Sequence, residues 1–351
     1  MNAKEEWRDP PSPLRVLISS GWLTDADARD PRLRVESGSS SHAVFRIRAP
    51  DGRTVVVKEV AREAAAAGRS LRGELFAYRL ANWISAVAAA LPHPLLIDEK
   101  HQVLVVESLG NSSIWPTIDG SSSIGSPGIA EQLGAIMAGW HDATQDTGLW
   151  ASPAIGILHM PDALDAATAG RAGTTQILMR SMVDDPELSS ALRAARAGWR
   201  DRCLIHGDIR RENWITVVPG RVTGLKVLDW ELSGSGDPAW DLGSVLAEFA
   251  LESIRGQRDD ASHWHLKQQA AIREFFQAYA THGGLLNTGE SSEWSHVVLC
   301  AVARLLHVAC EWAELQSSVE TGPVPAVVAE ARFLLHHRSE LVEQLMRHST
   351  A

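Results

Sequence analysis

Residues Leu204 to Leu246 read LIHGDIRRENWITVVPGRVTGLKVLDWELSGSGDPAWDLGSVL, and this stretch decides the expected fold. The triplet HGD ends a short apolar run at Asp208, and Asn213 follows it by five positions. Sixteen residues after Asn213, the strand-like segment LKVLD presents Asp229. We expect a hairpin between them, which places Asn213 and Asp229 on adjacent strands.

The spacing of these polar residues fits the transfer of a phosphoryl group. That reaction needs a carboxylate to orient or deprotonate the attacking hydroxyl, and Asp208 is the candidate catalytic residue. It also needs oxygen ligands for Mg2+, and an Asn oxygen with an Asp carboxylate suits that ion, so Asn213 and Asp229 are the candidate metal ligands. Arg210 is a second catalytic candidate, because a basic side chain there can neutralise charge on the migrating phosphoryl group.

The elements HGDxxxxN, DWE and GDPxxDL, in this order, resemble the catalytic segment of the aminoglycoside phosphotransferase and choline kinase family. The resemblance implies a catalytic aspartate at Asp208 and metal ligands at Asn213 and Asp229, with Asp237 and Asp241 mainly bracing the loop. It also implies an α+β, two-lobed protein-kinase-like fold. In that fold an N-terminal lobe holds an antiparallel sheet with one main helix, and the larger C-terminal lobe is mostly helical.

The expected metal-binding strand departs from protein kinases in one respect. It ends in DWE, where they carry DFG, so Glu231 replaces a glycine. We therefore expect no regulated backbone flip at this point. Glu231 either adds a contact to the metal or braces the neighbouring backbone.

The sequence before residue 110 predicts a strand-rich part. Residues 31–60 read as two strands joined by the turn signal PDG, and a helix is expected from about Glu63 to Val87. Further strands are expected over residues 91–97 and 101–109. Because residues 110–128 are dense in Ser, Gly and Pro, we expect a nucleotide-binding lobe at 1–110 and a helical lobe at 111–351, which carries the catalytic loop, the metal site and the acceptor site.

Two charged residues of the strand-rich part are candidate nucleotide-binding residues. Lys58 ends an alternating strand, and Glu74 lies sixteen residues later on the expected helix. Their order resembles the kinase pairing of a strand lysine with a helix glutamate, which positions the α and β phosphates.

The remaining candidate nucleotide contacts come from a turn and a connector. The turn at 36–45 has only Gly38 where protein kinases carry GxGxxG, so backbone amides and the hydroxyls of Ser39, Ser40 and Ser41 would line the phosphates. A polar hairpin turn without a ligand is the other interpretation. Residues 104–110 resemble the strand between the lobes, whose backbone at Glu107 to Leu109 would hydrogen-bond the nucleobase.

Two aromatic side chains outside the motifs carry structural expectations. Trp83, within the expected helix, reads as a helix-packing residue. His141, in the segment AGWHDA, is expected to form hydrogen bonds in the core rather than to act in catalysis.

Composition narrows the class of protein. The chain has 351 residues, 45% hydrophobic and 22% charged, as in ordinary globular proteins. Its net charge of -10 argues against nucleic acid as a partner, and with no leader-like N-terminus and no apolar run of about 18 to 20 residues we expect no membrane segment. Three cysteines suit a reducing cytoplasm.

The charge is uneven along the chain. Residues 231–351 hold 16 Asp and Glu against 8 Lys and Arg. This acidic third suits a cationic substrate or a basic partner, and a solvated acidic helix face is the other interpretation.

We therefore expect an ATP- or GTP-dependent phosphotransferase that moves the γ-phosphate, with Mg2+, to a hydroxyl of a small polar acceptor such as an aminoglycoside-like alcohol. One alternative is a kinase of Ser or Thr in a peptide, as in ribosomal-peptide maturation, which would imply a protein partner. Another is a pseudokinase that acts as a binding or scaffold module, although the intact set of Lys58, Asp208, Asn213 and Asp229 argues against it. The segments expected to grip the acceptor, drawn from 145–200 and 250–330, carry no motif that identifies it.

Overall fold

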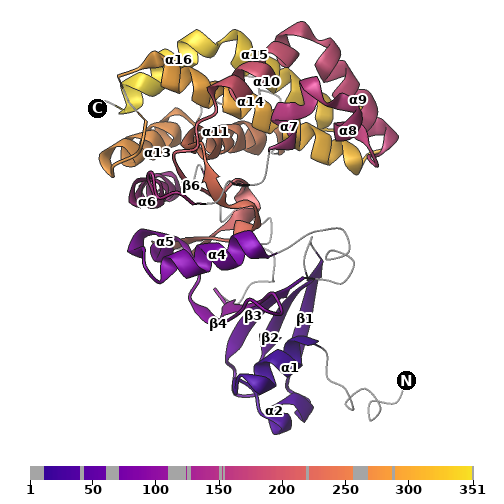
Figure 1. The fold of residues 1–351 in the computed structure, drawn as a ribbon, viewed down its shortest axis with the longest axis vertical. Coiled ribbons are helices and arrows are strands. Elements are labelled where there is room, and N and C mark those ends of the chain that lie inside the picture. The colour runs from indigo at the N-terminus through magenta and orange to yellow at the C-terminus, as the bar shows by residue number, and fades with distance from the viewer. Residues whose placement is uncertain are drawn as a thin grey trace. The chain divides into compact units, whose positions relative to one another are not determined.

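The computed structural model describes residues 12–39, 43–60, 71–109, 124, 128–149, 152, 155–218, 221–255, 268–286 and 289–349. The chain forms two compact units, which Figure 1 shows as ribbons. A strand-rich unit comprises Met1–Asp119 and Ile215–Glu231, and a helical unit comprises Gly120–Trp214 and Leu232–Ala351. Residues 110 and 111, where we expected the division between lobes, lie outside the described residues.

The strand-rich unit combines one antiparallel sheet, a two-stranded ribbon and short helices. Its elements in chain order are α1 (Ser12–Ser19), α2 (Asp25–Arg29), β1 (Arg34–Ser39), β2 (Ala43–Arg48), β3 (Thr54–Glu59), α4 (Arg72–Ala81), α5 (Ser85–Ala90), β4 (Pro94–Asp98), β5 (Val103–Glu107), β7 (Trp214–Val218) and β8 (Arg221–Val227).

The main sheet has the strand order β1-β2-β3-β5-β4, and all its pairs are antiparallel. The turn at PDG joins β2 to β3 as expected, with Arg48 opposite Thr54. The expectation of two strands over residues 31–60 was wrong, because the first run contains two strands: β1 ends at Ser39 and β2 begins at Ala43. Serine and glycine, which are frequent in this part of the sequence, favour interruption of a long strand.

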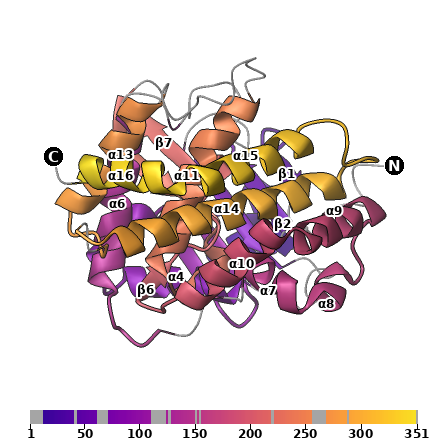
Figure 2. The ribbon, with the colours of Figure 1, turned by 90° about the horizontal axis from the view of Figure 1, so that it is seen from above.

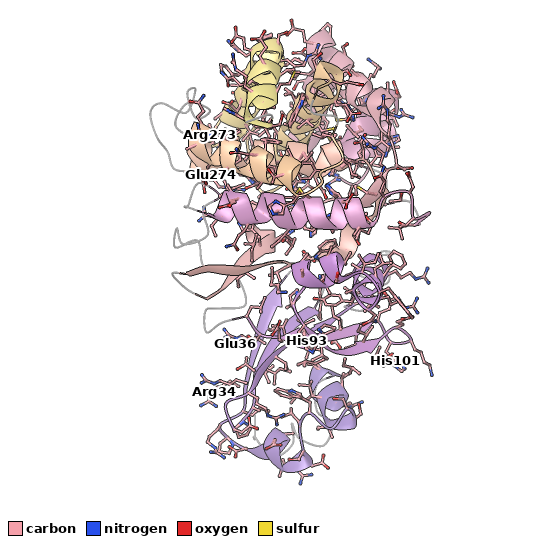
Figure 3. The ribbon with its side chains drawn as sticks, turned by 90° about the vertical axis from the view of Figure 1, so that its left-hand side faces the viewer. Arg34, Glu36, His93, His101, Arg273 and Glu274 are labelled. Atoms are coloured by element: carbon pink, nitrogen blue, oxygen red, sulfur yellow. The ribbon has the colours of Figure 1, made fainter. Side chains whose placement is uncertain are left out.

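The edge strand β1 carries charged side chains. Arg34 and Glu36 alternate along it, and both are exposed (Figure 3). Charges on an edge strand discourage pairing with another chain, because they would have to be desolvated. These two side chains make the β1 edge of the sheet polar.

One face of the sheet is covered by α1 and the loop that follows it, which the sequence analysis did not predict. Leu14, Leu17 and Leu23 pack with Val55 and Val57 in one buried cluster. Successive side chains of a strand point to opposite faces. The cluster therefore leaves the neighbouring side chain, Lys58, for the other face of β3.

The helix expected from Glu63 to Val87 is not continuous. Among the described residues α4 ends at Ala81, and α5 begins at Ser85. Asn82 closes α4, and Ile84 has an extended backbone with φ of -121° and ψ of 101°. A β-branched residue loses side-chain freedom in a helix, which favours the break at this point.

The remaining elements belong to the helical unit, apart from η4, whose residues are divided between the two units. They are α6 (Ile129–Ala143), α7 (Gly156–His159), the 3-10 helix η2 (Met160–Asp162), α8 (Leu164–Thr168), α9 (Gly173–Asp184), α10 (Pro186–Gly198), β6 (Cys203–Ile205), η3 (Arg211–Asn213), η4 (Trp230–Leu232), β9 (Gly234–Gly236), α11 (Pro238–Arg255), α13 (Gln269–Thr281), α14 (Ser291–Glu314), α15 (Val324–His336) and α16 (Arg338–Ser349).

Helix α14 forms the core of this unit and packs against α10, α11 and α15 (Figure 2). Contrary to the expectation from sequence, α14 is long and apolar enough to cross a membrane by length and composition alone. However, 78% of its most apolar window is buried inside the structure. Burial among other helices accounts for this apolar character, since a helix that is hydrophobic all round belongs in a protein core as well as in a membrane.

Candidate active site

In the strand-rich unit, one lysine joins two carboxylates from distant parts of the chain. Lys58 on β3 lies 2.5 Å, from Nζ to Oε2, from Glu74 on α4. The same ammonium forms an ion pair and hydrogen bond with Asp229, which follows β8. The three predicted residues are therefore brought together, although Asp229 is 171 positions from Lys58.

The charge state of this cluster follows from its burial and its partners. Burial alone would lower the pKa of Lys58, but the carboxylates of Glu74 and Asp229 outweigh burial and raise that pKa above its ordinary value. Lys58 thus remains a cation throughout the physiological range. An anionic ligand can replace one of the two carboxylates as a hydrogen-bond partner of this buried ammonium.

The backbone around Asp229 is specialised to present its side chain. Asp229 has φ of 64°, in the left-handed region that favours glycine. Such a conformation costs on the order of 1–3 kcal/mol and persists only where the surroundings enforce it. One restraint is local, since the indole nitrogen of Trp230 donates to Val227 O at 2.9 Å.

A glycine allows α4 to approach this bend. A Cβ atom added at Gly73 would lie 2.5 Å from the carbonyl oxygen of Glu231, closer than real Cβ contacts. Only glycine fits at such a distance without a shift of the backbone. Gly73 therefore fixes how closely Glu74, the next residue, lies to the segment that carries Asp229.

In the helical unit, the HGD segment is held by one carboxylate from α11. The backbone amides of His206 and Gly207 donate to Asp241 at 2.7 and 3.0 Å. Trp240 donates its indole N–H to Gly207 O at 2.8 Å. The expectation that Asp241 braces this loop agrees with these bonds, which satisfy buried amides that would otherwise cost about 1–3 kcal/mol each.

Gly207 is required at its position for two reasons. Its φ is 83°, and a Cβ atom there would lie 2.7 Å from Leu232 O. Larger residues would strain the backbone and displace that carbonyl. The loop after β6 can thus turn sharply and present Asp208.

Asp208 is held mainly through one of its two carboxylate oxygens. Arg210 donates Nε and Nη2 to Oδ1 at 3.0 and 2.8 Å. Arg304, on α14, donates Nη2 to the same oxygen at 2.7 Å. Oδ2 has a longer contact, at 3.4 Å from Asn213 Nδ2.

These guanidinium groups keep Asp208 ionised. Burial alone would raise the pKa of Asp208, but Arg304 and Arg210 outweigh burial and hold that pKa well below its usual range. Arg210 also pairs with Glu311 on α14, at 2.9 Å. Two guanidinium groups therefore contact the predicted catalytic carboxylate, and Glu311 holds one of them.

Asn213 has the geometry of an oxygen ligand. Its Nδ2 donates to the backbone oxygen of Asp208 at 2.9 Å, which orients the amide and leaves Oδ1 as its acceptor atom. Asp229 supplies carboxylate oxygens, and its side chain is 34% exposed. Hard oxygen donors of this kind suit Mg2+. Among the described residues, no three His, Cys, Asp or Glu side chains gather as a metal site by themselves.

The candidate nucleobase contacts are placed only in part. The amide of Glu107 donates to His93 O at 3.0 Å, and its side chain accepts from His93 N at 2.7 Å, so this N–H is already bonded. Leu109 follows β5 and is half-buried. Ser40 and Ser41 lie outside the described residues, and Ser39 is described as backbone alone, at the end of β1.

The two structural expectations had different outcomes. His141 is fully buried and bonds Tyr279 and Asp241, which confirms its core role. Trp83 is 87% exposed, so the expectation that it is a helix-packing residue was wrong. It lies just after α4, where the helix has already ended.

Sequence reasoning missed three residues of this region. Gly73, Arg304 and Glu311 belong to no motif that we recognised. For Arg304 a signal was present, because it stands alone in the apolar run VVLCAVARLLHVAC of α14. A single arginine on a buried helix needs a partner, since arginine is almost never fully buried without one.

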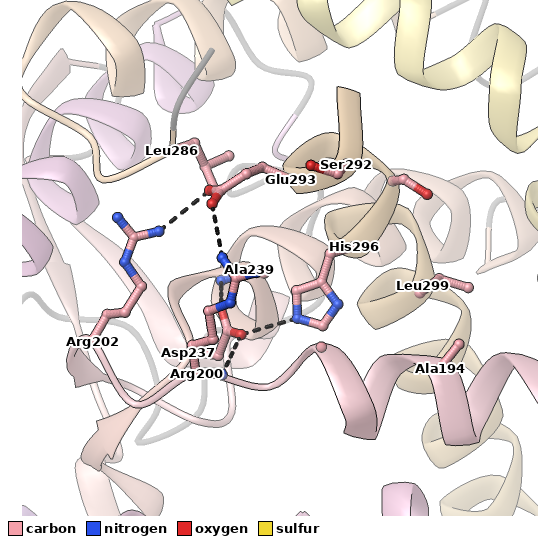
Figure 4. A pocket seen from close by; sticks show the side chains of 12 residues that line it. Ala194, Arg200, Arg202, Asp237, Ala239, Leu286, Ser292, Glu293, His296 and Leu299 are labelled. Atoms are coloured by element: carbon pink, nitrogen blue, oxygen red, sulfur yellow. Dashed lines mark hydrogen bonds and ion pairs between the residues drawn. The ribbon is translucent and has the colours of Figure 1, made fainter. Parts of the chain in front are cut away.

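The helical unit also contains a cavity of about 220 Å³, shown in Figure 4. It lies at the start of α14 and includes Arg200, Arg202 and Glu293. Both guanidinium groups pair with that carboxylate, each at 3.3 Å. None of the predicted catalytic or metal-binding residues lines this cavity.

Comparison with known proteins identifies the fold. The chain aligns with a choline/ethanolamine kinase family protein from Mesorhizobium loti (TM-score 0.56, 17% identity, 95% of this chain and 98% of that one). It also aligns with an ethanolamine kinase from Plasmodium vivax (TM-score 0.59, 9% identity, 98% and 91%) and with an amicoumacin kinase solved with AMP-PNP, Ca2+ and Ami (TM-score 0.56, 12% identity, 97% and 97%). At these identities the likeness confirms the expected kinase-like fold.

Sequence comparison identifies the family. A stretch of 87 residues is 38% identical to acyl-CoA dehydrogenase family member 10 of Mus musculus; it covers 23% of this chain and 8% of the mouse protein. The model of the phosphotransferase enzyme family matches residues 32–280, a range that contains Lys58, Glu74, Asp208, Asn213 and Asp229. The match covers more than half of the chain and confirms the resemblance seen in its motifs, so the chain belongs to the phosphotransferase enzyme family.

Proposed function

We propose that this phosphotransferase moves the γ-phosphate of ATP or GTP to a hydroxyl group of a small polar acceptor, such as an aminoglycoside-like alcohol. The observation that carries the proposal is the ion-paired cluster of Lys58, Glu74 and Asp229. Kinases need the strand lysine paired with the helix glutamate and an aspartate for the metal in place together. Here one ammonium contacts both carboxylates.

Within this proposal, Lys58 binds the α and β phosphates and Glu74 holds it in place. Asn213 and Asp229 are the proposed ligands of Mg2+, which when bound supplies positive charge against the β and γ phosphates. Backbone groups at Glu107 to Leu109 are the proposed contacts of the nucleobase. The hydroxyls of Ser39, Ser40 and Ser41 are the proposed contacts of the phosphates.

Asp208 is the proposed catalytic carboxylate. It accepts a hydrogen bond from the acceptor hydroxyl and aligns its oxygen for attack on the γ-phosphorus, with general-base effects of this kind contributing about 10²–10⁴-fold. The low pKa of Asp208 makes orientation its main contribution before transfer. It takes up the proton as the new phosphorus–oxygen bond forms and the bond to the nucleoside diphosphate breaks.

Arg210 is the proposed second catalytic residue. Its Nε and Nη2 hold Asp208. Among the hydrogen bonds of the described residues none involves its Nη1, which leaves that nitrogen for an oxygen of the transferred phosphoryl group. A fixed guanidinium there stabilises charge that develops in the transition state.

The compartment we propose is the reducing cytoplasm. Cys203, Cys300 and Cys310 are all buried and free. Burial raises the pKa of Cys310 to about 12, so this thiol stays protonated and unreactive. Such cysteines act as small apolar side chains of the core.

The test is phosphate transfer from γ-labelled ATP or GTP to pooled aminoglycosides, amino alcohols and Ser- or Thr-containing peptides. The expected result is a labelled phosphomonoester of a small alcohol that forms with Mg2+ and is lost with excess chelator. Label on a peptide alone would replace the small-molecule acceptor by the peptide alternative. Nucleotide binding without transfer to any pool would contradict the enzyme proposal and favour a binding module.

A further inference from the structure

Arg304 is an arginine in the interior of the helical unit. Its side chain is 1% exposed, on the central helix α14. Taking a guanidinium out of water is unfavourable unless charged or polar partners compensate for the lost hydration. The position of Arg304 therefore requires partners, and those partners show what it holds.

The principal partner of Arg304 is the proposed catalytic carboxylate. Nη2 donates to Asp208 Oδ1 at 2.7 Å, and Nη1 lies 3.3 Å from His307 Nδ1. Its Nε makes no hydrogen bond among the described residues. Both terminal nitrogens are thus engaged, which fixes the plane of the guanidinium next to Asp208.

The bonds around Asp208 are distributed unequally between its oxygens. Oδ1 accepts two hydrogen bonds from Arg210 and one from Arg304, at 2.7 to 3.0 Å. Within the part of the chain that the structure describes, Oδ2 has only the 3.4 Å contact with Asn213 Nδ2. A carboxylate oxygen offers about two lone-pair directions, so Oδ1 is saturated and Oδ2 retains capacity.

Two separate elements create this asymmetry. Arg210 comes from the catalytic loop itself, so it moves with Asp208, whereas Arg304 comes from a buried helix and is fixed relative to the core. Glu311, two turns after Arg304 on α14, accepts a hydrogen bond from Arg210 Nη2 at 2.9 Å. Helix α14 thus anchors the carboxylate directly and through Arg210.

Resting on the proposed function, we propose that Arg304 is a positioning residue that holds Asp208 by Oδ1 and so reserves Oδ2 for the acceptor hydroxyl. The hydroxyl donates its hydrogen bond to Oδ2. Its oxygen then forms a bond to the γ-phosphorus while the bond to the β–γ bridging oxygen breaks. The nucleoside diphosphate leaves with that electron pair, and the hydroxyl proton passes to Oδ2 and from there to solvent.

The test compares Arg304→Met with wild type at saturating nucleotide and acceptor. Without Arg304 the carboxylate is held by Arg210 alone and can rotate, and a small misplacement of a reacting group can cost about 10²-fold. We expect kcat to fall by roughly 10- to 100-fold, with the KM for the nucleotide within about twofold of wild type. In Arg304→Ala, added guanidinium ion should restore part of the lost kcat, which a general loss of stability would not allow.

The matched control is Arg202→Met. Arg202 is a half-buried arginine of the helical unit that, like Arg304, pairs with a carboxylate, but its partner is Glu293. Its replacement should leave kcat unchanged. An equal loss of kcat in both variants would overturn the role of Arg304.

Further outcomes decide the inference if activity or folding fails. If Arg304→Met does not fold, Arg304→Lys is measured in its place, because lysine keeps the charge but lacks the planar fork. A kcat of Arg304→Lys equal to that of the wild type would overturn the inference.

If the wild type transfers phosphate to no acceptor, the proposed function fails, and crystal structures decide on Arg304 separately. A crystal structure of Arg304→Met with Asp208 oriented as in wild type would overturn the inference; a rotated carboxylate would support it.

Discussion

At the scale of single residues, Lys58 shows how burial and charge together restrict one side chain. It is buried, so its charge must be compensated, and it meets Glu74 and Asp229. Removing one member of a buried ionic group typically costs about 3–5 kcal/mol, because the remaining charge is left unpaired. The three charges therefore depend on one another, and the proposed phosphate contact uses a cation that they hold in place.

We predict that Lys58→Met weakens nucleotide binding and lowers the melting temperature. The loss follows because Glu74 and Asp229 then face each other without the ammonium. Calorimetric titration with Mg2+ and ATP or GTP measures the affinity, which should fall at least about tenfold, or 1.4 kcal/mol.

The control for Lys58 is Lys226→Met. Lys226 belongs to the same unit and donates to Ala89 O at 2.8 Å, away from the cluster. Its replacement should leave nucleotide affinity unchanged. If both variants bind nucleotide as tightly as the wild type, the assignment of Lys58 is wrong.

At the scale of elements, close approach depends on the absence of a side chain. Helix α4 meets the backbone of the DWE segment at Gly73, where a Cβ atom would lie 2.5 Å from Glu231 O. Because that neighbour is backbone, it cannot rotate away. The pairing of Lys58 with Glu74 therefore depends on a contact between two elements that sequence motifs do not reveal.

We predict that Gly73→Ala shifts α4 and weakens nucleotide binding. Overpacking of this kind costs about 1–3 kcal/mol, so the melting temperature should also fall. Gly173→Ala is the matched control, because Gly173 also lies in the first turn of a helix but its added Cβ meets nothing within 4 Å. Thermal melts and nucleotide titration of both variants measure the effect, and equal behaviour of the two would refute the proposed close contact.

Local patterns predicted some elements well and others poorly. The hairpin at PDG and the strands β4 and β5 followed from turn residues and β-branched runs, which act locally. The helix break at Asn82 to Ile84 and the cover of α1 over the sheet depend on tertiary packing, which overrides propensity. The partner of Arg304 could not be assigned from sequence, because no motif links this arginine to Asp208, 96 positions away.

At the scale of the whole molecule, each compact unit carries some of the proposed functional residues. Lys58, Glu74 and Asp229 belong to the strand-rich unit, and Asp208 and Asn213 belong to the helical unit. The motif order singled out each of these candidates from sequence, because the proposed metal and phosphate chemistry restricts residue types and spacing. The acceptor could not be predicted, since no comparable restriction acts on the segments expected to bind it.

We predict that Mg2+ and nucleotide together stabilise the protein against heat. A ligand at 100 times its dissociation constant adds about 2.7 kcal/mol to the free energy of unfolding. For a chain of this size the melting temperature should rise by several degrees, at about 2–4 °C per kcal/mol or less. A thermal-shift scan with nucleotide alone, Mg2+ alone and both together measures this change. The absence of a shift with ATP and with GTP would count against nucleotide binding.

The most direct test of the account is the rate of phosphate transfer by Asp208→Asn, measured beside its nucleotide affinity. The substitution keeps the size of the side chain but removes the charge that orients the hydroxyl. The account predicts that affinity for Mg2+-nucleotide stays within about threefold of wild type, while turnover falls by on the order of 10²–10⁴. Wild-type turnover in Asp208→Asn would contradict it.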